Sequence, residues 1–139
     1  MNWKLILQLS LFGLVMGVGT VWVIPSTLEP FLWLVVFVVS AYLIATRAAT
    51  RYFLHGVAVG LANSIWVTGA HVLWFSQYIA NHPREAAMMQ SMPLPTHPRL
   101  LMVITGPVIG LISGIIIGLF AVIAHRLATP RVRPAVSNS

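Results

Sequence analysis

The chain has no cysteine and only two acidic residues among its 139 positions. Without cysteine it can form neither disulfides nor thiolate metal sites, and it has no cysteine nucleophile. Charged side chains make up 7% of the sequence, whereas a soluble globular domain carries about 25%. This number of charges is too small to cover the surface of a water-soluble fold. We therefore exclude soluble, disordered and collagen-like proteins.

Apolar residues dominate instead, at 58% of the chain. They gather into four stretches long enough to cross a bilayer, which takes about 20 helical residues. We therefore predict an all-α integral membrane four-helix bundle, with residues 1–128 as a single transmembrane domain. We expect spans at 5–24, 27–46, 52–79 and 99–125, joined by an outer loop at 80–98 between the third and fourth.

The positive charges are distributed unevenly between the two sides of this predicted bundle. If the N-terminus is cytoplasmic, six of the eight Lys and Arg residues lie inside, and only Arg84 and Arg99 lie outside. Glu29 and Glu85 also fall outside. The positive-inside rule therefore predicts an N-in, C-in topology, with 129–139 as a disordered, basic cytoplasmic tail. We expect a multi-pass protein of a bacterial inner (plasma) membrane, whose basic charge serves topology rather than nucleic-acid binding.

Two loops carry signals for helix starts. Ser26 and Glu29 have the spacing of a capping box, and Pro30 suits the first turn of a helix, so we expect a tight hairpin between the first two spans. In the outer loop, Pro83 follows two candidate N-cap residues. The loop therefore predicts a short interfacial helix over 83–91.

Small residues recur at four-residue spacing in three of the spans. Such rows allow helix backbones to approach closely, which matters in lipid because burial alone does not drive helix association. The partner is either another span of this chain, or another copy or a larger membrane complex, and the sequence leaves both open. The glycines that we expect to pack helices are Gly13, Gly17, Gly56, Gly60, Gly106, Gly110, Gly114 and Gly118.

Pro107 interrupts the hydrogen-bond pattern of the fourth span near its outer end. Proline lacks the N–H that would bond to the carbonyl four residues earlier, so a kink is expected there. In a membrane the freed carbonyl needs a partner. We expect Thr105 or a water to supply one.

Polar side chains gather on one side of the third span, where Asn63, Ser64, Thr68 and His71 fall in one arc of a helical projection. This arc should face the bundle, since an amide or imidazole has no partner in hydrocarbon. His71 has two interpretations: a structural hydrogen bond to Thr68 or a neighbouring helix, or a place in a ligand or proton path. No carboxylate, Lys or Arg lies in mid-span, which weakens the case for ion-coupled transport.

The outer loop also holds soft-metal ligands. Thioethers and imidazoles suit Cu(I), so a copper site is an alternative to an apolar helix face lying on the bilayer. We favour the helix face, and expect neither a metal nor a cofactor. The alternative copper ligands are His82, Met88, Met89, Met92 and His97.

The motifs typical of metalloproteases, phosphate-binding loops and serine hydrolases are missing from the sequence. We therefore predict a small non-enzymatic membrane protein. Its expected partners are the lipid bilayer, a small solute and further copies of itself. Asn63, Ser64, Thr68 and His71 would line a polar pathway or binding pocket for that solute. The alternative is an accessory or assembly subunit that docks a larger membrane complex through the face of Gly106, Gly110, Gly114 and Gly118. Copper handling at the outer loop is the third hypothesis.

Overall fold

The computed structural model describes residues 1–128, so the predicted tail at 129–139 lies outside the described part of the chain. All regular secondary structure in this part is helical, with no strands. Four of the helices are long and apolar enough to cross a membrane, which confirms the predicted set of four long apolar helices. The helices are α1 (Trp3–Trp22), α2 (Glu29–Arg47), α3 (Tyr52–Leu73), α4 (Phe75–Asn81), α5 (Pro83–Ser91) and α6 (Pro98–Ala128).

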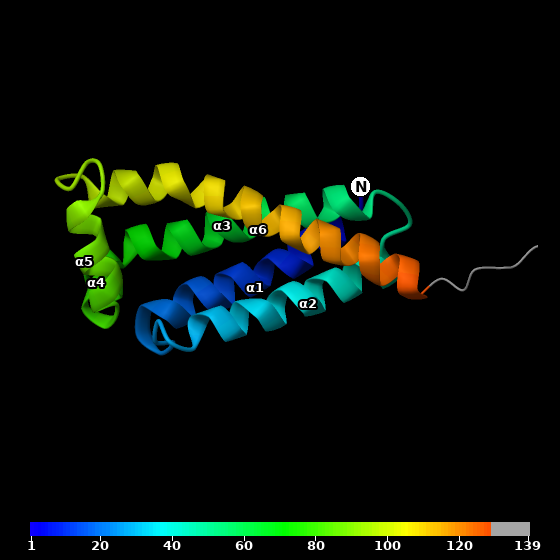
Figure 1. The fold of residues 1–139 in the computed structure, drawn as a ribbon, viewed down its shortest axis with the longest axis horizontal. Helices are drawn as coiled ribbons and strands as arrows, with labels where there is room; N and C mark the ends of the chain where they lie inside the picture. The colour runs from blue at the N-terminus through cyan, green and yellow to red at the C-terminus, as the bar shows by residue number, and fades with distance from the viewer. Residues whose placement is uncertain (129–139) are drawn as a thin grey trace, which may run out of the picture.

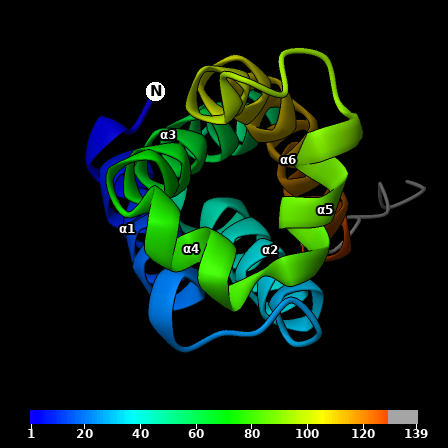
Figure 2. The ribbon, with the colours of Figure 1, turned by 90° about the vertical axis from the view of Figure 1, so that its left-hand side faces the viewer.

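The long helices lie side by side, and α4 and α5 cross one end of the bundle (Figures 1 and 2). Helix α3 packs against both α6 and α1, while α2 packs mainly against α6. The short loop between α1 and α2 was expected to make them a tight hairpin. They contact each other little, so the prediction of a tightly packed pair is wrong. Helix α2 makes most of its contacts with α6 and few with α1 or α3.

The outer surface of the bundle is apolar along its length. Large hydrophobic side chains are widely exposed on all four long helices, for example Leu34, Ile65 and Ile112. In water such a surface would favour aggregation, whereas in lipid it is the ordinary exterior of a helical bundle.

The glycine row of α6 packs against α3 of the same chain. A Cβ built on Gly60 would overlap the backbone of Gly114, and one built on Gly114 would lie 2.7 Å from the carbonyl oxygen of Val57. Neither contact leaves room for a side chain, so the two backbones touch directly. Gly56 meets Gly118 in the same way, and Gly106 and Gly110 face Thr68 and Ser64.

Helix α1 meets the other side of α3 through its own glycines. A Cβ on Gly13 would lie 2.6 Å from the Cα of Asn63, and one on Gly17 would lie 2.9 Å from the Cα of Val67. Of the two interpretations left open by the sequence, the structure therefore shows packing within the chain for all of these rows. A partner that docked through the α6 row would have to displace α3.

The predicted third span, 52–79, was too long. Helix α3 ends at Leu73, and Trp74 leaves the helical region with φ −107° and ψ 41°. The ring of Trp74 packs edge-on against Trp22, with centroids 4.9 Å apart, and α4 lies against the end of α1. The sequence stays apolar through this break, so hydropathy alone does not reveal it. The fourth span is instead longer than predicted, at 31 residues.

At two positions a side chain expected to satisfy a helix backbone group bonds to another partner. The N-cap of α2 is Leu28, with no side-chain cap, and Ser26 Oγ donates instead to Glu85 of α5 at 3.0 Å. Thr105 Oγ1 donates to the carbonyl of Leu101 at 2.9 Å and not to the carbonyl freed by Pro107. Helix α5, in contrast, has the predicted bounds, with Pro83 in its first turn.

The glycine contacts predict a clear difference between two alanine substitutions on α3. Gly60→Ala forces a Cβ into the backbone of α6 and should lower the free energy of unfolding by about 1–3 kcal/mol, as overpacking does. Gly69→Ala has nothing within 4 Å of the new Cβ, so it should leave stability unchanged or raise it by about 0.5–1 kcal/mol through helix propensity. Denaturant unfolding of the purified protein in detergent, followed by circular dichroism, measures both. Equal stabilities would contradict the close packing of α3 and α6.

Candidate functional site

A cavity of about 470 Å³ lies inside the bundle, between α2, α3 and α6 and beneath the segment α4–α5. All four residues predicted to line a pathway or pocket, Asn63, Ser64, Thr68 and His71, lie in its wall. The rest of the wall comprises Glu29, Trp33, Phe37, Gly60, Val67, Tyr78, Met89, Met102, Thr105, Gly106, Ile109 and Ser113.

The helix packing explains why the cavity forms on this side of α3. Helix α3 is held tightly to α6 by glycines and to α1 on its other flank, whereas it touches α2 only weakly. The polar arc of α3 lies beside the glycine stripe, so it turns toward the space that α2 leaves open. Ser64 keeps its own hydroxyl satisfied by donating to the carbonyl of Leu61 at 2.8 Å.

Asn63 lines the cavity and is also tied to helix α1. Its Oδ1 accepts a hydrogen bond from the backbone N–H of Gly13 at 3.1 Å, which fixes the orientation of the amide. The Nδ2 group is buried without a hydrogen-bond partner, and the residue is only 3% exposed. A buried amide group without a partner costs free energy.

His71 is held by helix α1. Its Nε2 lies 2.7 Å from Thr20 Oγ1, and the Thr20 hydroxyl is itself within donating distance of the carbonyls of Met16 and Gly17. The hydroxyl either donates to one of these carbonyls and accepts from His71 Nε2, or donates to Nε2, according to the tautomer of His71. The expected structural partner was Thr68 or a neighbouring helix, and the neighbouring helix supplies it.

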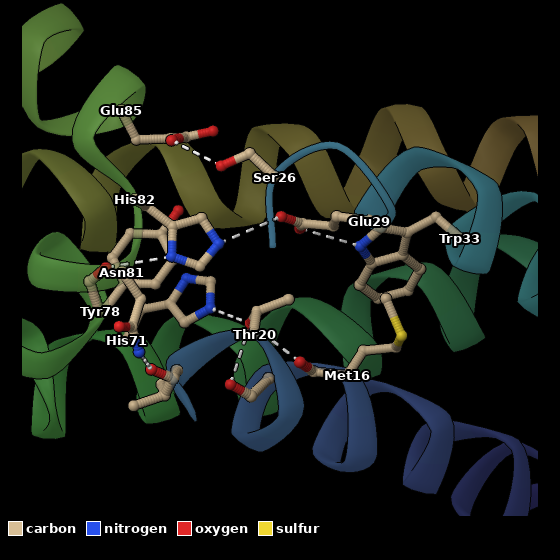
Figure 3. A network of polar contacts seen from close by, with 12 residues as sticks. Met16, Thr20, Ser26, Glu29, Trp33, His71, Tyr78, Asn81, His82 and Glu85 are labelled. Atoms are coloured by element: carbon tan, nitrogen blue, oxygen red, sulfur yellow. Dashed lines mark hydrogen bonds and ion pairs between the residues drawn. The ribbon is translucent and has the colours of Figure 1, made fainter. Parts of the chain in front are cut away.

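The rings of His71, Tyr78 and His82 form a stack toward the end of the bundle that α4 and α5 cross (Figure 3). His71 stacks on Tyr78 with centroids 3.9 Å apart, and Tyr78 stacks on His82 with centroids 4.4 Å apart. Burial, together with the carboxylates of Glu29 and Glu85, raises the pKa of Tyr78 above its ordinary value, so its phenol stays neutral. The stack ties α3, α4 and the start of α5 into one unit at the end of the cavity.

His82, the last ring of this stack, lies near a carboxylate of α2. Its Nδ1 lies 3.0 Å from the carbonyl oxygen of Tyr78 and donates to it. Its Nε2 is fully buried without a hydrogen-bond partner and lies 3.9 Å from Glu29 Oε2. Glu29 also accepts a hydrogen bond from Trp33 Nε1 at 3.2 Å.

Sequence reasoning missed the contribution of α2 to the site. Glu29 was interpreted as a helix cap, yet it lines the cavity together with Trp33 and Phe37. The signal was present in the spacing, since positions 29, 33 and 37 share one face of a helix. An acid and two aromatics on one face predict a common environment, but the pattern does not say which neighbour they meet.

The residues of the alternative copper site lie in different surroundings. His82 is fully buried, whereas Met88 and Met92 are 56% and 38% exposed, and Met89 points to the cavity wall. His97 Nδ1 pairs with Thr96 Oγ1 at 2.9 Å on the surface. The exposed positions of Met88 and Met92 fit an apolar helix face better than a shared metal site.

In three comparisons, no family model, curated protein or solved structure matched the chain. We therefore infer the function from the geometry of the cavity.

The bond between Thr20 and His71 predicts a stability difference between two isosteric substitutions. Thr20→Val removes the hydroxyl that bonds to the His71 ring and should lower the free energy of unfolding by about 1 kcal/mol. Thr46→Val is the control, because the Thr46 hydroxyl bonds only to carbonyls of its own helix. Thermal unfolding in detergent compares the two. If Thr46→Val is as harmful as Thr20→Val, the bond between α1 and α3 contributes nothing specific.

Proposed function

We propose that the chain is a multi-pass integral membrane protein, with α1, α2, α3 and α6 as spans and both chain ends on the cytoplasmic side. The distribution of charge supports this orientation, since Lys4, Arg47, Arg51 and Arg126 lie at one end of the bundle. Cytoplasmic ends of membrane proteins are enriched in such residues. In this orientation α4 and α5 cover the outer end.

We further propose that the protein is non-enzymatic and binds a small solute in the cavity, as a pocket or as part of a polar pathway. The observation that carries the proposal is that Asn63, Ser64, Thr68 and His71 of α3 all line one open volume of about 470 Å³ inside the bundle. Protein interiors contain few voids larger than a water molecule, and pockets for small molecules span about 300–1,000 Å³. Polar groups inside a membrane are costly to keep, so packing alone does not account for them.

The accessory-subunit hypothesis receives less support from the structure. It relied on the glycine face of α6, and that face is covered by α3 within the chain. A docking partner would need a different surface, and nothing in the described residues singles one out. Assembly into oligomers stays a prediction.

Because the natural chain has no cysteine, single cysteines can test whether the cavity is open to polar molecules. Ser64→Cys and Thr68→Cys place thiols in its wall, and Ile65→Cys places one on the outer apolar surface, where residue 65 is 71% exposed. Iodoacetamide reacts with the thiolate, which forms in water and not in hydrocarbon. In proteoliposomes we expect the two cavity thiols to react about tenfold faster than the thiol at position 65.

A second substitution checks that the reaction takes place in the cavity. Ser113→Phe adds a ring to the cavity wall and should slow labelling of the Thr68→Cys variant. Ile112→Phe adds the same ring to the outer surface, where residue 112 is 55% exposed, and should leave the rate unchanged. Equal rates at positions 64, 65 and 68 would contradict a polar cavity.

A further inference from the structure

We propose that the solute is a small organic cation, with the Glu29 carboxylate as its counter-charge and the rings of Trp33 and Phe37 as its apolar contact. This inference rests on the proposed binding function and names the chemical class of the ligand. It is carried by three properties of the cavity wall: its charge, the free hydrogen-bonding capacity of Glu29, and the arrangement of the aromatic rings.

The first property is the sign of the charge. Among the lining residues Glu29 is the one carboxylate, and no Lys or Arg lines the cavity. Its side chain is 23% exposed, so its field is screened less than that of a surface carboxylate. An anionic ligand would meet a carboxylate with no lysine or arginine to offset it. A cation would meet an opposite charge.

The second property is that Glu29 is only partly satisfied. An ionised carboxylate has about four lone-pair sites, and in the described part of the chain Glu29 accepts one hydrogen bond, from Trp33. The nearest His82 nitrogen lies 3.9 Å from Oε2, which is beyond hydrogen-bond distance. The second acid at this end, Glu85, is bonded to Ser26 and does not line the cavity. Glu29 is therefore the acid placed to accept from an ammonium group or to neutralise one.

The third property is the pair of rings that follow Glu29 along α2. The centroids of Trp33 and Phe37 lie 5.9 Å apart, and the two planes are tilted by 54°. Both rings line the cavity, and the face of an aromatic ring attracts a cation. Tyr78 is not available in this way, because His71 and His82 stack on it.

The α3 wall adds a requirement for the rest of the ligand. Ser64 and Thr68 bring hydroxyl groups to the cavity wall, and hydroxyls can exchange hydrogen bonds with an oxygen-bearing group on the ligand. The chemistry of the wall thus fits an ammonium compound that also carries a hydroxyl or carbonyl oxygen. Choline has both groups and serves as a probe of this class.

Protection of the Thr68→Cys variant from iodoacetamide tests the proposal with three probes of one shape. Choline is the cation, 3,3-dimethylbutan-1-ol is its uncharged carbon isostere, and 3,3-dimethylbutanoate is the related anion. We expect choline to slow labelling at a concentration about tenfold lower than the alcohol requires, with the anion weaker still. The alcohol thus separates the effect of charge from the effect of shape.

Two glutamine substitutions identify the acid responsible. Glu29→Gln keeps the length of the side chain and an oxygen acceptor for Trp33, and should abolish the preference for choline over the alcohol. Glu85→Gln removes the same charge from the same end of the protein without touching the cavity, and should keep the preference. Glu29→Asp retains the charge, so it should also keep the preference, and it guards against loss of folding as the cause.

The outcomes separate this inference from the function on which it rests. If choline gives no protection, or protects no better than the alcohol, the cationic class is wrong while labelling of Thr68→Cys still supports an accessible cavity. The same holds if the preference survives Glu29→Gln, or if both glutamine variants lose it. If iodoacetamide never reaches position 68, the proposed function fails and this inference fails with it.

Discussion

The direct backbone contact between α3 and α6 is the constraint on which the rest of the structure depends. Where Gly60 meets Gly114 there is no side chain to separate the helices. Helix α1 is held to the opposite flank of α3 by Gly13 and Gly17 in the same manner. With both flanks of α3 in contact with neighbouring helices, the open volume lies on the side of α3 that faces α2. The cavity is thus the unfilled volume left by tight packing elsewhere.

A second set of contacts closes the end of this volume that lies beneath α4 and α5. The stacked rings of His71, Tyr78 and His82 run from α3 into the segment α4–α5, and the bond between Ser26 and Glu85 fastens α5 to the loop before α2. These contacts join α3, α4, α5 and the loop before α2. They also bring Glu29, a residue at the end of a helix, to the edge of the cavity, where its charge acts on the interior.

Much of the fold could be predicted because the signals are local. Hydropathy marks the long helices, Pro83 marks the start of α5, and helical periodicity places Asn63 through His71 on one face. The missed features all depend on a partner distant in sequence. Trp74 breaks the third span beside Trp22, Ser26 turns from its own helix to Glu85, and Glu29 lines a cavity although its sequence position is that of a cap.

The sequence by itself determined that four apolar helices form, that small residues repeat along three of them, and that the polar side chains of α3 share a face. Those properties follow from hydrophobicity and from the geometry of a single helix. Only the tertiary structure decided which helices the glycines bring together, and that α2 would rest on α6 and leave open space in front of α3. That choice depends on surfaces that meet only after the chain has folded, and no repeat within one helix encodes it.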